Sequence, residues 1–150
     1  MAHTFTNLLT HVIFSTKGRA PSIADEIRGD LHAYLGGIVR NLNGTAIKID
    51  GPKDHVHLLL VVPADKSVSE FLRTLKANST KWLHEKWPAR KSFAWQTGYS
   101  AFAVSDSNRA RVISYIENQQ EHHKKVSFEE EFLAFLKHNN IPYDPRFVLD

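Results

Sequence analysis

Hydrophobic and polar positions change their period several times along the chain, and each change predicts a new element. Residues 9–16 are rich in β-branched and aromatic side chains, which predicts a strand. Over 23–42 the apolar positions recur every three or four residues, which predicts a helix. Asn43-Gly44 is a turn signal that ends this helix.

The middle of the chain predicts two more strands and a second helix. A short alternating strand is expected at 45–50, and a turn at 51–54 leads into a mostly apolar strand at 55–62. Because strands buried on both faces are apolar along their length, the strand at 55–62 is predicted to be central in its sheet. Ser67–Glu70 has the form of a capping box that opens a helix with one buried apolar face, reaching about Leu83.

The C-terminal third predicts one further strand and two further helices. The strand is expected around 99–104, and Ser105 or Ser107 can cap a helix that runs to about His123. Ser127–Glu130 is a second capping-box pattern and opens a short helix. The whole order is strand, helix, strand, strand, helix, strand, then helices, which favours a ferredoxin-like (RRM-like) α+β fold with an antiparallel sheet.

Length and composition bound the kind of protein. One hundred and fifty residues predict a single domain over 1–150, with a core at about 8–138 and an extended tail at 139–150. The absence of cysteine excludes a disulfide scaffold, a thiolate zinc site and a cysteine nucleophile. No apolar run approaches the ~20 residues of a membrane span, and no signal peptide is visible. We therefore expect a cytoplasmic protein with no membrane partner.

Charge is distributed unevenly along the chain. Residues 1–125 hold 17 basic and 11 acidic side chains, whereas 126–150 hold 2 basic and 5 acidic ones. The segment 66–91 alone holds seven basic and two acidic residues, with tryptophans nearby. A basic body with aromatic side chains suggests nucleic acid as a partner, and an ordinary solvated helix face is the alternative.

His55-Val56-His57 is the first group of residues that could carry chemistry. Within a strand, residues two apart face the same side at a distance of about 6.6 Å, so both imidazoles can meet one metal ion. Val56 and Leu58 would face the opposite side. The alternative is a pair of partly buried, hydrogen-bonded histidines on an edge strand. A third metal ligand would have to come from elsewhere in the chain.

The second group lies on the helix that follows Ser107. Tyr115 and Gln119 are four residues apart and share a face, and Arg111 and His122 lie near the same stripe. A tyrosine on a helix is usually packing. Its phenol has a pKa near 10, however, so the phenolate is a good leaving group from a phosphotyrosine ester. The phosphoryl group of such an ester can be transferred to a DNA 3′-hydroxyl without ATP.

The chain resembles the one-tyrosine HUH transposases, small bacterial insertion-sequence enzymes that act on single-stranded DNA, and their REP-associated relatives. The resemblance runs from about residue 8 to 138. The matching pieces are THVIFSTKGR at 10–19, DHVHLLL at 54–60, WQTGYSAFAVS at 95–105, YIENQQEHH at 115–123 and FEEEF at 128–132.

This resemblance implies a role for each matching residue. His55 and His57 match the histidine pair that binds a divalent cation, Mg²⁺ or Mn²⁺. Tyr115 matches the nucleophile, and Gln119 matches the residue that completes the metal site. Gln120 is adjacent, but the four-residue spacing favours Gln119. The family works as a homodimer, and in some members the tyrosine helix of one subunit serves the histidine pair of the other.

The implied reaction is cleavage and rejoining of single-stranded DNA, at hairpins near element ends, through a 5′-phosphotyrosine intermediate and without a nucleotide cofactor. Basic side chains should hold the phosphate backbone and make binding salt-dependent. The candidates follow the first strand, lie on the second helix or open the tyrosine helix: Lys17, Arg19, Arg73, Lys76, Arg109 and Arg111.

Three other functions stay open from the sequence. A host-adapted REP-associated relative would use the same chemistry, and the resemblance places either protein in a bacterial or archaeal cell, near the nucleoid. A non-catalytic nucleic-acid-binding module on the same sheet is a second alternative, although no RNP1-like aromatic run is present. A metal-dependent phosphodiesterase that uses water is the third, and it would leave no covalent adduct.

Overall fold

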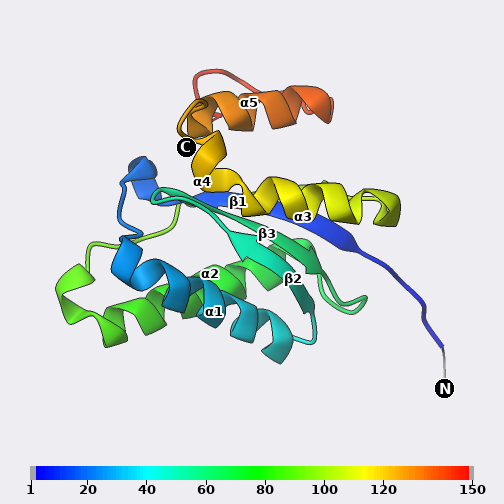
Figure 1. The fold of residues 1–150 in the computed structure, drawn as a ribbon. Coiled ribbons are helices and arrows are strands. Elements are labelled where there is room, and N and C mark those ends of the chain that lie inside the picture. Colours follow the sequence, from blue (N-terminus) through cyan, green and yellow to red (C-terminus); the bar gives the residue numbers. More distant parts are fainter. Residues whose placement is uncertain (1–2, 149–150) are drawn as a thin grey trace.

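A four-stranded antiparallel sheet lies at the centre of the computed structural model, which describes residues 3–148 (Figure 1). The strands run in the order β2-β3-β1-β4. They are β1 (Leu9–Ser15), β2 (Thr45–Asp50), β3 (His55–Val61) and β4 (Ser100–Ala103). One helix joins β1 to β2 and a second joins β3 to β4, so the predicted ferredoxin-like α+β fold is confirmed.

Helices cover both faces of this sheet (Figure 1). The first layer consists of α1 (Asp25–Asn41) and α2 (Val68–Lys86). The second layer consists of α3 (Arg109–Glu117), α4 (Gln119–His122) and α5 (Phe128–His138). Three short 3-10 turns lie in the connections, at Lys17–Arg19, Pro88–Arg90 and Asp106–Asn108. Among the residues that the structure describes, no helix has both the length and the apolar character needed to cross a bilayer.

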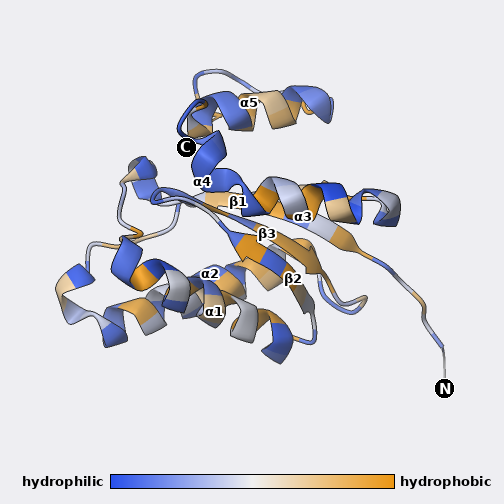
Figure 2. Ribbon diagram, in the orientation of Figure 1, coloured by the Kyte–Doolittle hydropathy of each residue, from blue (hydrophilic) through white to orange (hydrophobic). Residues whose placement is uncertain are grey.

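The two faces of the sheet differ in chemistry because side chains alternate along each strand. Val56 and Leu58, with alternate residues of β1, pack against α1 and α2 in the main hydrophobic core. His55 and His57, which alternate with them, face the second helical layer. Figure 2 shows the strands as largely hydrophobic and the outer sides of the helices as hydrophilic. Because β3 lies between β2 and β1, the alternative of a histidine pair on an edge strand is wrong.

Capping explains where several helices begin. The Ser67 hydroxyl accepts a hydrogen bond from the backbone N–H of Glu70, and Ser127 accepts one from Glu130. Both serines were predicted to cap these helices from sequence, and both caps are confirmed. Asn43 ends α1 with a φ of 66°, the left-handed conformation that Asn tolerates.

The long helix predicted from Ser105 or Ser107 to His123 is wrong in its continuity. The chain forms a 3-10 turn first, begins α3 at Arg109, and breaks between α3 and α4 at Asn118. The Asn118 side chain donates to the Ser114 carbonyl oxygen at 2.8 Å, beside the 3.2 Å bond from its own backbone N–H to the same oxygen. Gln119, the first residue after the break, contacts His55 and His123.

Candidate active site

His55 and His57 lie side by side on β3 and are fully buried, each with 0% exposure. Their ring centroids are 5.2 Å apart, and both rings face the layer of α3, α4 and α5. The loop before His55 is tight: a Cβ on Gly51 would lie 2.4 Å from the His55 carbonyl oxygen. The backbone of this hairpin therefore requires glycine at position 51. The close approach of Gly51 to His55 fixes the backbone position of this histidine at the start of β3.

A carboxylate from α5 meets these histidines. Oε1 of Glu131 is 2.8 Å from Nε2 of His57 and 3.5 Å from Nε2 of His55. The other oxygen, Oε2, is 3.1 Å from Nε2 of His122 and 3.2 Å from Nε2 of His123. Glu131 is 3% exposed, so a buried carboxylate is surrounded by imidazoles from two different segments of the chain.

Three of these imidazoles are held in place through their outer nitrogen. Nδ1 of His55 bonds to Oδ1 of Asp54 at 2.7 Å, and Nδ1 of His57 shares a 2.8 Å hydrogen bond with Nε2 of His11. His123 Nδ1 donates to the Val126 carbonyl oxygen at 2.7 Å. In each ring Nε2 then points into the common space. Metal-binding histidines are typically oriented by a second hydrogen bond of this kind.

The donor set fits a divalent cation. One ligand atom from each of His55, His57, His123 and Glu131 lies within 4.8 Å of the others. Ligands on opposite sides of a small divalent ion are separated by about twice a bond length, or roughly 4.0 to 4.6 Å. Mixed imidazole and carboxylate donors suit Mn²⁺ and similar ions.

Burial and pairing move the pKa values of this cluster in different directions. Burial alone would lower the pKa of His55, but hydrogen bonds with Asp54 and Glu131 outweigh it and raise that pKa. Complete burial lowers the pKa of His57 to about 4. Burial likewise opposes ionisation of Glu131, yet hydrogen bonds from the histidines hold its pKa far below the usual range. Glu131 is therefore an ionised carboxylate.

Tyr115 lies on α3 beside this cluster within the same chain. Its hydroxyl donates to Oε2 of Glu131, and it lies 3.3 Å from Nε2 of His122. Burial, with the hydrogen bond to Glu131, raises the pKa of the Tyr115 phenol. The ring borders a cavity of about 400 Å³ that is also lined by His122, Glu131 and Phe135. The phenol can thus be reached from outside the protein.

Gln119 reaches the histidines from the first turn after the helix break. Its Oε1 is 2.9 Å from Nε2 of His123 and 3.4 Å from Nε2 of His55. Its Nε2 donates to Oε2 of Glu131 at 3.3 Å. Gln119 is fully buried, whereas the neighbouring Gln120 is exposed. The structure thus brings Gln119, and not Gln120, to the histidine pair.

Sequence reasoning missed His11, His123 and Glu131. His123 follows Gln119 by four residues, so helical spacing could have placed it on the same face. His11 lies on the strand next to β3, but no sequence signal gives the strand register, which sets His11 opposite Leu59 and so diagonally across from His57. Glu131 is the last of three consecutive glutamates, and only its position three residues after Phe128 hints that it faces inward.

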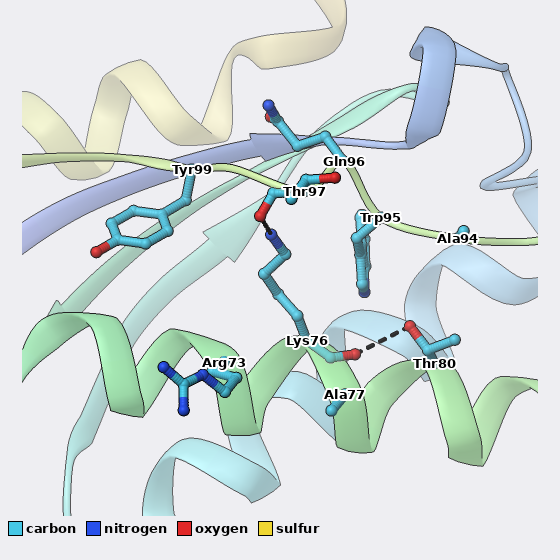
Figure 3. A pocket seen from close by; sticks show the side chains of 9 residues that line it. All are labelled: Arg73, Lys76, Ala77, Thr80, Ala94, Trp95, Gln96, Thr97 and Tyr99. Carbon is cyan, nitrogen blue, oxygen red and sulfur yellow. Dashed lines mark hydrogen bonds between the residues drawn. The ribbon is translucent and has the colours of Figure 1, made fainter. Parts of the chain in front are cut away.

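Two of the predicted DNA-binding residues line a separate cavity of about 470 Å³ between α2 and the segment before β4 (Figure 3). Arg73 is exposed on the wall of this cavity, near the ring of Tyr99. Lys76 turns inward: its Nζ donates to the carbonyl oxygens of Thr97 at 3.1 Å and Gly98 at 2.7 Å. Burial lowers the pKa of Lys76 to about 8. Lys76 thus anchors the loop, and Arg73 presents an exposed charge at the cavity.

The other predicted DNA-binding residues are spread over the surface. Lys17 is exposed and Arg19 half-buried in the turn after β1. Arg109 forms an ion pair with Asp106 at 2.8 Å. Arg111 is exposed and borders a cavity of about 280 Å³ that Tyr115 also lines. Arg111 therefore shares a cavity wall with the tyrosine.

Comparison of the sequence with known families and proteins gives consistent matches. The family described as IS200-like transposases matches residues 4–119. The transposase for insertion sequence element IS200 of Salmonella typhimurium is 31% identical over 129 residues, which span 83% of this chain and 84% of that protein. The ISDra2 transposase TnpA of Deinococcus radiodurans is 28% identical over 116 residues, or 74% of this chain and 83% of that protein.

Solved structures share the fold. A crystal structure of a candidate transposase from Deinococcus radiodurans has a TM-score of 0.66 and 27% identity, covering 79% of this chain and 95% of that one. The structure of a REP-associated tyrosine transposase bound to a REP hairpin has a TM-score of 0.61 and 16% identity, covering 84% and 74%. The second likeness supports the fold alone.

Proposed function

This chain belongs to the IS200-like transposase family, and from that premise we propose that it cleaves and rejoins single-stranded DNA through a covalent bond to Tyr115. The observation that carries this proposal is the meeting of Tyr115 and the histidine pair around one carboxylate. The phenol hydroxyl donates to Glu131, and the same carboxylate contacts His57. A nucleophile and a set of metal-binding side chains therefore share one buried space beside an open cavity.

His55 and His57 would hold a divalent cation, Mg²⁺ or Mn²⁺, with Gln119 as a further oxygen donor. When bound, such an ion would polarise a phosphate oxygen and stabilise the negative charge on the phosphate oxygens during the transfer. The chain's own residues do the rest. Asp54 and His11 orient the two imidazoles, and Glu131 fixes the direction of the Tyr115 hydroxyl.

The proposed covalent step exchanges one phosphoester for another. The Tyr115 oxygen attacks the scissile phosphorus, a bond from that oxygen to phosphorus forms, and the bond from phosphorus to the DNA 3′-oxygen breaks. The phenol loses one proton and the leaving 3′-oxygen gains one, so no oxidant or nucleotide is consumed. The product is a 5′-phosphotyrosine and a free 3′-hydroxyl, and attack by another 3′-hydroxyl reverses the step.

The proposed substrate is single-stranded DNA that carries a hairpin. A REP-associated tyrosine transposase of the same fold is bound to a REP hairpin, which supports this choice. The basic body of the chain offers phosphate contacts, with Arg111 beside the phenol and Arg73 on the cavity of Figure 3. We further propose that the active protein is a homodimer, as the family resemblance implies. A role in a mobile element and a host role would use the same chemistry.

A denaturing gel tests the proposal. The purified chain is incubated with end-labelled single-stranded DNA that carries a hairpin, in Mn²⁺, in Mg²⁺ or in EDTA. We expect a protein–DNA adduct that requires the metal and is absent from Tyr115→Phe, because that variant keeps the ring and loses the attacking oxygen. Tyr143→Phe is the matched control, since this tyrosine is exposed near the C-terminus and should leave the adduct unchanged.

Two results would contradict the proposal. An adduct that persists in Tyr115→Phe would assign the nucleophile to another residue. Metal-dependent cleavage without any adduct would indicate a phosphodiesterase that uses water. Several hairpins and flanking sequences belong in the assay, because the chemistry is visible only on DNA that the protein binds.

A further inference from the structure

Glu131 lies on α5, outside the residues 4–119 that the family match covers, yet its carboxylate is at the centre of the site. Its Oε1 is 2.8 Å from Nε2 of His57 and 3.5 Å from Nε2 of His55. We infer that Glu131 is itself a ligand of the cation, so that α5 becomes part of the metal centre. This inference rests on the metal-dependent function proposed above and extends it, since the resemblance implies only the two histidines and Gln119.

The imidazoles around Glu131 are aimed into one common space by hydrogen bonds to their outer nitrogens. His123 Nδ1 faces the Val126 carbonyl oxygen, which only accepts, so that nitrogen carries a proton. Asp54 likewise faces Nδ1 of His55. A neutral imidazole protonated on Nδ1 has a lone pair on Nε2. In that form Nε2 of each ring can bind a cation. Oε1 of Glu131 is 3.5 Å from Nε2 of His55 and its Oε2 is 3.2 Å from Nε2 of His123, so the carboxylate lies within reach of the same ion.

The packing of α5 sets the position of the carboxylate. Phe128, Phe132 and Leu136 of α5 pack in a hydrophobic cluster with side chains of β1 and β4. Glu131 is the buried polar residue on this apolar face, and its side chain is 2% exposed. A buried carboxylate is costly unless it is paired or coordinates a metal. These apolar contacts hold α5 against the sheet, and they thereby place both carboxylate oxygens of Glu131 next to the histidines.

A simpler role for Glu131 is to neutralise protonated imidazoles, with no contact to metal. The two roles differ in what the carboxylate does to metal affinity. A ligand raises that affinity, and its replacement by an amide weakens binding. A carboxylate that only neutralises protonated imidazoles holds protons that compete with the metal, so its replacement by an amide leaves metal affinity unchanged or higher.

Calorimetric titration of Mn²⁺ into the full chain without DNA separates the two roles. The protein is first stripped with EDTA, and the chelator is then removed. We expect wild-type protein to bind Mn²⁺ and Glu131→Gln, which keeps the size of the side chain, to bind more than about 100-fold more weakly, beyond the roughly 10- to 100-fold that the loss of an outer-shell partner costs. Glu129→Gln is the control, because Glu129 is exposed on the same helix and its replacement removes the same charge. Its affinity should match that of the wild type.

Hydrogen exchange gives a second measurement that does not depend on activity. If Glu131 binds the ion, Mn²⁺ should slow exchange of the α5 amides in wild-type protein and in Glu129→Gln, but not in Glu131→Gln. Circular dichroism in EDTA shows whether each variant is folded. Should Glu131→Gln fail to fold, the wild-type exchange decides, and an absence of Mn²⁺-dependent protection in α5 would overturn the inference.

The outcomes separate this inference from the function on which it rests. Equal Mn²⁺ affinity in wild-type protein and Glu131→Gln would show that the carboxylate only neutralises the imidazoles, and the two-histidine metal site would stand. If wild-type protein bound no Mn²⁺, both the metal-dependent function and the role of Glu131 would be overturned.

Discussion

Burial gives individual histidines of this fold different protonation behaviour. His55 lies against two carboxylates, which raise its pKa, whereas burial lowers the pKa of His11 to about 3. His32 on α1 lies far from this cluster in the fold and is buried under the opposite face of the sheet. Burial lowers its pKa to about 4, and its Nε2 has no hydrogen-bond partner among residues 3–148. A buried neutral imidazole of this kind makes stability depend on pH.

His32 should make the protein less stable in mild acid. The unfolded chain takes up a proton on this residue near pH 6.5, but the folded chain does so only near pH 4. The free energy of unfolding should therefore fall as the pH drops from 6.5 to 4, by up to about 3 kcal/mol from this residue. Urea denaturation at pH 7 and pH 4.5 measures it, and His32→Gln should show a smaller loss than wild type. An equal loss in both proteins would exclude His32 as a cause.

Elements were predictable from sequence to different degrees. The strands and the first two helices could be predicted from the spacing of apolar residues and from the turn residues, because long-range packing reinforces those local signals. The break at Asn118 could not be predicted from the sequence. No glycine or proline marks this position, and asparagine is tolerated inside helices unless the tertiary structure favours a bend. The contact of α5 with β3 was also unpredictable, because it depends on how a separate helix docks. Consequently His55, His57, Tyr115 and Gln119 were candidates from sequence, and Glu131 was not.

The hairpin between β2 and β3 should not tolerate a side chain at position 51. A Cβ on Gly51 would lie 2.4 Å from the His55 carbonyl oxygen and 3.0 Å from the Val56 Cα, both backbone atoms. Gly51→Ala should lower the free energy of unfolding by about 1–3 kcal/mol, typical of overpacking, and should weaken Mn²⁺ binding because His55 moves. Urea denaturation and metal titration measure the two effects.

Gly29→Ala is the matched control for this substitution. Gly29 lies on α1, and a Cβ there would meet no atom within 4 Å. Alanine is a better helix former than glycine, so this variant should be as stable as wild type or slightly more so. If Gly51→Ala were as stable as Gly29→Ala, the hairpin would be able to relax, and its proposed role in positioning His55 would be wrong.

At the scale of the whole molecule, one sheet separates two different surfaces. The layer of α3, α4 and α5 covers the histidine face, and the layer of α1 and α2 carries the cavity with Arg73 (Figures 1 and 3). The charge asymmetry of the chain was visible in the sequence. The sequence did not show which basic side chains are available to bind DNA. Lys76 is bound by backbone carbonyl oxygens, and Arg109 is paired with Asp106.

Arg73 should contribute one phosphate contact to DNA binding. For single-stranded DNA, each neutralised phosphate contributes about 0.7 to the slope of log affinity against log salt concentration. Arg73→Gln should therefore bind a hairpin with single-stranded flanks more weakly at low salt and reduce the slope by about 0.7. Fluorescence anisotropy over a salt series measures it. Lys81→Gln, which removes an exposed charge on the same helix outside the cavity, is the control, and an equal change in both variants would argue against a specific contact.

The central claim, that Tyr115 forms the covalent bond to DNA, is tested most directly by mass spectrometry of the adduct. The protein is reacted with single-stranded DNA in Mn²⁺, treated with nuclease and protease, and its peptides are sequenced. The account predicts that the peptide containing Tyr115 carries a nucleotide joined through its 5′-phosphate, and that the released DNA fragment ends in a 3′-hydroxyl. A nucleotide on any other residue, or a 3′-phosphate linkage, would contradict it.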